Sequence, residues 1–126
     1  MQEIARRTEP ADSKLRLVVE RHVTMLLANR DAGRIFFEDR YDLPDEAAEE
    51  ILGIGRALRG IFVQIIRQGV EEGVFDTVEP DRAALYVLGM CNWTYRWYRE
   101  SGPLSAQQVA DEVARLCLRA LGAPSR

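Results

Sequence analysis

Residues 44–73 read PDEAAEEILGIGRALRGIFVQIIRQGVEEG, and this stretch decides the fold class of the chain. Its apolar residues recur every three or four positions, which is the spacing of one face of an α-helix. Pro44 fits a first helical turn because its φ is fixed, and Gly73 fits the left-handed residue that often ends a helix. The stretch therefore predicts one unbroken helix, about 45 Å long at about 1.5 Å per residue.

The remaining sequence has the same helical spacing and no alternation typical of a strand. Four further helices are predicted, from Asp12 or Ser13 to Asn29, from Asp31 to about Arg40, from Pro80 to about Glu100, and from Ser105 to Leu121. Ser105 and Gln108 have the spacing of a capping box at the start of the last helix. We therefore expect an all-α fold with five to six helices.

The long helix differs in composition between its two sides. The apolar side, expected to face the core, carries Ile51, Ile54, Leu58, Ile61, Phe62, Ile65 and Gly69. The other side carries Gly53, Ala57, Gly60 and Gln64. Such a ridge of small residues either admits a neighbouring backbone, leaves room beside the helix, or is a solvated face that tolerates glycine.

The composition indicates a soluble globular domain. Of 126 residues, 47% are hydrophobic and 29% charged, and no apolar run approaches the roughly 20 residues that a membrane-spanning helix needs. The first residues are charged, unlike a secretion signal, so a cytoplasmic location is expected. Cys91 and Cys117 lie in helical segments and are expected as buried free thiols. Basic residues are scattered among acids and the net charge is −3, so the chain alone should bind DNA poorly.

The sequence offers no catalytic or metal-binding constellation. The single histidine, His22, lies inside an amphipathic helix with nothing near it to complete a catalytic triad, and a core or boundary position is the simpler interpretation. Neither a CxxC pair nor an HExxH motif is present, so no metal and no cofactor are predicted. The adjacent carboxylates Glu49–Glu50 and Glu71–Glu72 point apart on a helix and indicate solvated faces. An enzymatic function is therefore not expected.

Aromatic residues gather in residues 89–98, which read GMCNWTYRWY. Projected on a helix, one stripe consists of Tyr86, Met90, Trp93 and Trp97. The adjoining side consists of Gly89, Asn92, Arg96 and Arg99. Rings can bury the apolar surface of a small ligand, while Asn92 or Arg96 can hold a carbonyl, carboxylate or phosphate. The alternative is ordinary core packing, with Arg96 stacked on Trp93 as a structural cation–π pair.

The residues from Ala83 to Cys91 are apolar on every side of their helix, which predicts burial all the way round. In a chain of this size, part of the covering surface would come from a second copy. The helices from Pro80 to Glu100 and from Ser105 to Leu121 would then form a four-helix bundle with their counterparts about a two-fold axis. A ligand beside the first of these helices could alter the subunit geometry, because that helix would touch both cavity and interface.

These residues resemble the ligand-binding domain of TetR/AcrR-type transcriptional repressors, in the branch with a motif close to N-W-x-x-x-W-Y in the penultimate helix. The motif corresponds to residues 92–98, NWTYRWY, and a loop with Gly102 and Pro103 follows it. The order and lengths of the predicted helices also resemble this family, from about Ala11 to Leu121. The resemblance implies a C-terminal effector-binding and dimerisation domain that works as a homodimer.

The resemblance also implies an acyl-CoA inducer, because several repressors with this motif respond to acyl-CoA thioesters. Under this hypothesis the acyl part would lie among Phe36, Phe62, Tyr86, Met90, Trp93 and Trp97, and Arg96 could meet a thioester oxygen or a phosphate. Whole repressors of the family carry about 50 further N-terminal residues that form a helix-turn-helix. Residues 1–126 are therefore expected to be one domain, in which residues 1–10 are the remnant of a linking helix and DNA is bound only through the absent part.

Two other functions compete with this hypothesis. The chain could be a helical dimerisation or interaction module without a small ligand, in which the aromatic stripe is the dimer core. It could also be a small helical hydrolase or lyase, which would have to turn over an acyl-CoA.

Overall fold

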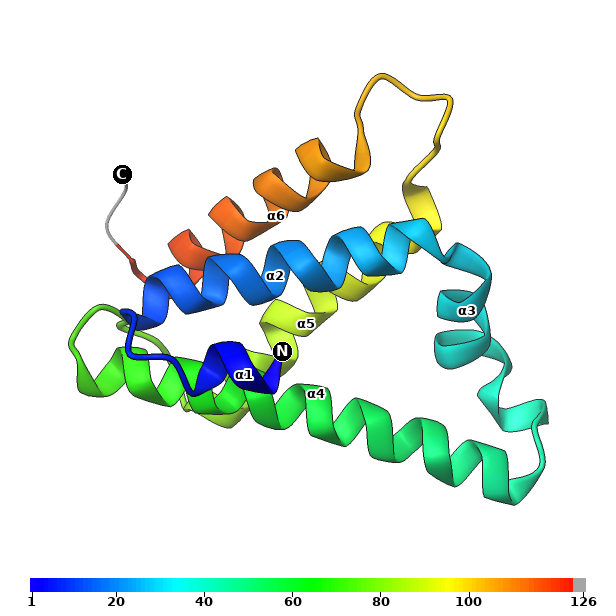
Figure 1. The fold of residues 1–126 in the computed structure, drawn as a ribbon, viewed down its shortest axis with the longest axis horizontal. Helices are drawn as coiled ribbons and strands as arrows, with labels where there is room; N and C mark the ends of the chain where they lie inside the picture. The colour runs from blue at the N-terminus through cyan, green and yellow to red at the C-terminus, as the bar shows by residue number, and fades with distance from the viewer. Residues whose placement is uncertain (124–126) are drawn as a thin grey trace.

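Helices make up all the regular structure of residues 1–123, the part of the chain that the computed structural model describes (Figure 1). They are α1 (Gln2–Ala5), α2 (Ala11–Ala28), α3 (Arg30–Arg34), the π-helix η1 (Ile35–Asp39), the 3-10 helix η2 (Arg40–Asp42), α4 (Asp45–Glu71), α5 (Pro80–Trp97) and α6 (Ala106–Ala120). The predicted all-α class is confirmed.

Local signals set most helix ends as predicted. Gly73 has φ +77° after α4, and the N–H groups of Val74 and Phe75 donate to the Gly69 carbonyl at 2.9 and 3.1 Å. Before α6, the Ser105 hydroxyl accepts from the Gln108 N–H, and the Gln108 side chain accepts from the Ser105 N–H. A left-handed glycine and a capping box therefore end and begin these helices.

The start of α2 differs from the prediction, because the cap comes from a distant residue. The helix begins at Ala11, and the Ala11 N–H donates to the carboxylate of Glu72 at 3.0 Å. Next to this contact the buried Lys14 ammonium donates to the Ala5 carbonyl at 2.9 Å and to the Gln68 amide oxygen at 2.7 Å. The end of α4 thus holds both α1 and the start of α2.

The single helix predicted from Asp31 to Arg40 is divided into three short pieces. After α3 the backbone widens into the π-helix η1 and then tightens into η2. A π-turn inserts an extra residue into a helical turn, so it changes the direction of the side chains that follow. In this chain the widened turn carries the neighbouring rings Phe36 and Phe37 together with Glu38.

The core lies where α2 packs against α6, α4 and α5 (Figure 1). Only the second half of α4 takes part fully, with Phe62, Ile65, Ile66 and Gly69 buried. Because α4 has 27 residues and α2 and α5 have 18 each, its first half extends past the main packing region, towards α3.

The apolar side of α4 therefore differs from the prediction. Ile54 is 59% exposed, and Ile51 is only half-buried. A methyl group added at Gly53 or Gly60 would meet no atom within 4 Å. The small-residue ridge accordingly faces open space in the single chain.

Candidate functional site

The side of α5 that carries most of the aromatic stripe faces outward. Tyr86 is 63% exposed, Trp93 59% and Trp97 49%, and Leu85 and Gly89 are also exposed. The prediction that residues 83–91 are buried on every side is therefore wrong for the single chain. The physical reason is that α2, α4 and α6 cover the opposite side of α5, where Ala84, Val87, Leu88 and Cys91 are buried.

A polar pair on the covered flanks joins α5 to α2. The Nε2 atom of His22 lies 2.6 Å from the Oδ1 atom of Asn92. The His22 ring also meets the ring of Phe62 on α4, edge to face, with 6.2 Å between the ring centroids. Three helices thus contribute one residue each to this contact, in which His22 and Phe62 are buried and Asn92 is half-buried.

An aromatic cluster lies one turn further along α5. The ring of Tyr95 stacks on Phe37 at 5.4 Å, and Phe37 meets Phe36 edge to face at 4.8 Å. Gly55 of α4 has no side chain at this place, and a methyl group there would come within 3.1 Å of the Phe36 ring. We call the set His22, Phe36, Phe37, Phe62, Asn92 and Tyr95 the inner site.

Glu38 closes the outer end of the inner site. Its carboxylate accepts hydrogen bonds from the Tyr95 hydroxyl at 2.5 Å and from the Arg96 guanidinium at 2.8 Å. Desolvation raises the pKa of Tyr95 above its ordinary value, and the hydrogen bond with Glu38 raises it further by a smaller amount. The Arg96 guanidinium also lies 5.2 Å above the Trp93 ring, so Arg96 connects η1 with the exposed side of α5.

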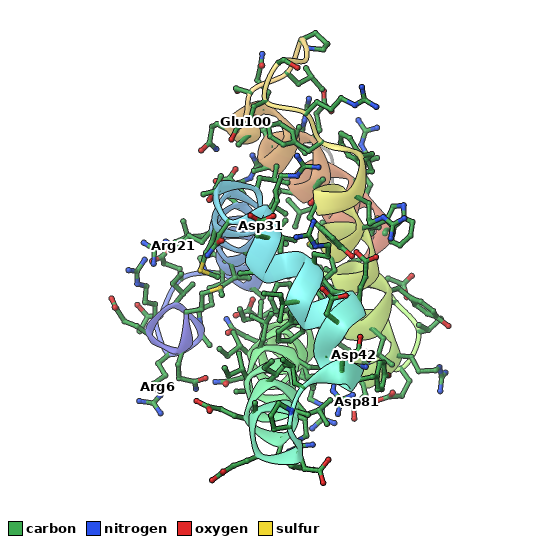
Figure 2. All side chains as sticks on the ribbon, turned by 90° about the vertical axis from the view of Figure 1, so that its right-hand side faces the viewer. Arg6, Arg21, Asp31, Asp42, Asp81 and Glu100 are labelled. Carbon is green, nitrogen blue, oxygen red and sulfur yellow. The ribbon has the colours of Figure 1, made fainter. Side chains whose placement is uncertain are left out.

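A surface groove of about 310 Å³ opens beside this closure, on the side of the molecule that faces the viewer in Figure 2. It is lined by Arg30, Asp31, Arg34, Glu38, Tyr95 and Arg96. The Nε atom of Arg30 donates to the Tyr95 carbonyl at 3.0 Å, and Arg34 forms an ion pair with Asp31 at 3.4 Å. Arg96 is likewise paired with Glu38, so three guanidinium groups face two carboxylates, and the excess of one positive charge can attract an anionic group.

The eight residues predicted to bind a ligand do not lie in one place. Phe36, Phe62 and Asn92 belong to the inner site. Tyr86, Trp93 and Trp97 lie on the exposed side. Half-buried Met90 lies in a groove next to α6, with Ala120 and Leu121, and Arg96 stands between the two sides. His22 contacts both Asn92 and Phe62, whereas Phe36 meets Phe37 and faces Gly55. The ligand site stays a prediction.

His22, Phe37 and Tyr95 were not among the predicted site residues. The spacing could have identified Tyr95, since it follows Asn92 by three residues and so lies on the same side of α5. His22 and Phe37 have no such signal, because their partners are far away in the sequence or depend on the π-turn.

Two further properties of residues 1–123 bear on function. No three His, Cys, Asp or Glu side chains within this range are placed to hold a metal ion. None of the helices within it has both the length and the apolarity to cross a membrane.

The stability of the fold is expected to depend on pH through His22. Burial lowers the pKa of His22 below its ordinary value of 6.5, and the hydrogen bond with Asn92 acts in the opposite direction. As the pH falls, the unfolded chain binds the proton first, so the stability from the neutral ring is complete above about pH 6.5 and lost below it. Denaturant titrations across this range should show a smaller loss in His22→Phe. The carboxylates titrate in both proteins, and equal losses would contradict this role of His22.

The sequence matches a known protein family over most of its length. A family model described as "Tetracyclin repressor-like, C-terminal domain" matches residues 8–121. The chain is also 26% identical over 98 residues to the HTH-type transcriptional repressor KstR2 of Mycobacterium tuberculosis, a match that covers 77% of this chain and 46% of that protein. The chain therefore spans about half the length of the curated relatives it matches.

Solved structures show the same fold. A TetR/AcrR-family regulator from Thermobifida fusca superposes with a TM-score of 0.84 at 30% identity, over 93% of this chain and 62% of that one. AibR, solved with isovaleryl coenzyme A and operator DNA, superposes with a TM-score of 0.77 at 19% identity, over 92% of this chain and 63% of its own. By the extent of the family match, the chain belongs to the tetracyclin repressor-like C-terminal domain family.

Proposed function

We propose that the chain is the effector-binding and dimerisation domain of a cytoplasmic transcriptional repressor, and that its effector is a hydrophobic acyl-CoA or a related derivative of a carboxylic acid. The observation that carries this proposal is the inner site, in which a partly buried polar pair and an aromatic cluster lie beside a groove lined by three arginines and two carboxylates. Because the matched HTH-type repressors are about twice as long, we assign DNA binding to the other half of such a protein.

We assign the two parts of an acyl-CoA to the inner site and the groove. Apolar acyl carbons would pack on Phe36 and Phe62, and Asn92 would orient the carbonyl group. Phosphate groups would lie in the groove near Arg96. The isovaleryl coenzyme A bound by AibR supports this class of ligand.

The exposed side of α5 fits a second copy of the chain. Trp93, Trp97 and Tyr86 give it a large aromatic surface, and Leu116 of α6 is 56% exposed. Association of α5 and α6 with their counterparts would form a four-helix bundle around a two-fold axis. These exposed rings also favour the second candidate function, a helical dimerisation module without a ligand.

Calorimetric titration with isovaleryl-CoA, octanoyl-CoA and free coenzyme A separates these functions. The proposal expects the thioesters to bind more tightly than coenzyme A alone. If none of the three compounds binds, the dimerisation module without a ligand is the remaining candidate function. A thiol assay on the same mixtures detects any coenzyme A released by hydrolysis, and release would identify an enzyme instead.

The Arg96→Ala substitution is expected to weaken acyl-CoA binding about tenfold, because a charge-assisted hydrogen bond to a phosphate or thioester oxygen is lost. The same titration measures this affinity, and sedimentation should show unchanged association of subunits. Arg6→Ala is the matched control, since it removes the same charge from a residue well away from Asp31 and the groove (Figure 2). Equal affinities of the two variants would assign Arg96 a purely structural role with Glu38 and Trp93.

A further inference from the structure

His22 has a buried ring nitrogen without a hydrogen-bond partner. The residue is only 5% exposed, and its Nε2 atom is occupied by Asn92. Among the residues that the structure describes, no atom donates to or accepts from the His22 Nδ1 atom. Buried polar atoms nearly always have a partner in folded proteins, so this one calls for an explanation.

The Asn92 contact determines where the proton of the His22 ring lies. The structure places the Oδ1 atom of the Asn92 amide next to the ring, and because an amide oxygen accepts, this placement assigns the hydrogen to Nε2. Burial lowers the pKa of His22, and the ring is therefore neutral near pH 7, with a single N–H. The Nδ1 atom is then an acceptor whose lone pair is unused.

The contacts of the ring within residues 1–123 supply no donor for this lone pair. On α4 it meets the apolar ring of Phe62. The Tyr95 hydroxyl, one turn from Asn92 on α5, donates to Glu38, and none of the ion pairs of the described residues involves His22. None of the described residues therefore donates to this atom, and a bound molecule could supply the donor.

We propose that the His22 Nδ1 atom accepts a hydrogen bond from the effector, an inference that rests on the proposed function of the domain. The effector then carries a hydroxyl or amide N–H group within its apolar part. Asn92 holds the ring in the required orientation, and Phe62 packs on the carbons next to the donor. An effector with only a carbonyl oxygen at this place would put two acceptors against each other. Buried polar groups reject such ligands strongly, so hydroxyacyl compounds are favoured over their keto counterparts.

Because His22 is the only histidine, its ring nitrogens give the only imidazole signals of the chain. Nitrogen-15 spectra of protein labelled in histidine, recorded at about pH 7.5, where an unshifted histidine is neutral, report which nitrogen carries the hydrogen. We expect a protonated Nε2 and an unprotonated Nδ1. A protonated Nδ1 would overturn the proposal, since the effector would then have to present an acceptor.

Titration with cyclohexanol and with cyclohexanone tests the donor itself, because these probes share a ring and differ in the polar group. We expect cyclohexanol to shift the Nδ1 signal towards that of a hydrogen-bonded nitrogen, with a response at least several-fold larger than that to cyclohexanone. Thermal stabilisation should show the same preference for the alcohol in the wild-type protein and lose it in His22→Phe. Equal responses to the two probes, or none, would overturn the proposal. A signal that is already at the hydrogen-bonded position and does not move would assign Nδ1 to a resident water and would also overturn it.

The results of this experiment and of the acyl-CoA titration can refute the two proposals separately. A shift of the Nδ1 signal with cyclohexanol, without binding of any thioester, would support the acceptor site and refute the acyl-CoA class of effector. Binding of thioesters together with a protonated Nδ1 would refute the acceptor site alone.

Discussion

The Trp93→Ala substitution is expected to raise the dissociation constant of the proposed homodimer roughly a thousand-fold. Trp93 is 59% exposed, and a methyl group added at Gly89, one turn earlier on the same side, would meet no atom within 4 Å. In a two-fold symmetric interface each substitution acts twice. A tryptophan at an interface centre contributes about 2 kcal/mol or more, so two of them account for the thousand-fold effect. Sedimentation equilibrium over a range of protein concentrations measures it.

Ile54→Ala is the control for this experiment. Ile54 has the same exposed fraction as Trp93, 59%, but lies on the first half of α4. Its removal should leave the dissociation constant unchanged. A wild-type chain that stays monomeric, or equal effects of the two variants, would show that this side of α5 is not the interface.

The Gly69→Ala substitution is expected to lower the free energy of unfolding by about 3 kcal/mol, at the upper end of the range for overpacked cores. A methyl group at Gly69 would lie 2.0 Å from a carbon of the buried Phe75 ring. Phe75 cannot simply move away, because its own N–H donates to the Gly69 carbonyl. Urea denaturation followed by circular dichroism measures the change.

The matched control is Gly60→Ala, in the same helix. A methyl group there meets no atom within 4 Å, and alanine stabilises a helix interior by up to about 1 kcal/mol over glycine. The two variants should therefore change stability in opposite directions. If Gly69→Ala is also stabilising, Phe75 does not pack on α4 as described.

The helices could be predicted from the sequence because their signals are local. The end of α4 at Gly73 and the start of α6 after Ser105 each depend on a few neighbouring residues. The start of α2 depends instead on Glu72, which is 61 residues away from Ala11. The π-turn after α3 likewise has no signature in its own residues. The start of α2 and the division of the helix after Asn29 were therefore missed, because they depend on a long-range contact and on a π-turn.

The candidate site was harder to predict, because a helical projection orders residues around an axis without saying which side is covered. For α5 the projection grouped Tyr86, Trp93 and Trp97 correctly, and their size and apolarity indicated a covered stripe. In the single chain that stripe is exposed, since α2, α4 and α6 lie on the other side. His22 was placed correctly at a buried position, but its partner Asn92 is 70 residues away and could not be identified.

The position of the two tryptophans determines what optical measurements on this domain report. Trp93 and Trp97 are the only tryptophans in the chain, and both lie on the same uncovered flank of α5. Their emission wavelength depends on contact with water, so it follows the covering of this flank by another protein surface. The positive charge of Arg96 lies above the Trp93 ring and also influences its emission, so the signal depends on the Glu38 contact as well. Intrinsic fluorescence would therefore report the association proposed for this flank, and binding of the proposed effector at the inner site requires a separate measurement.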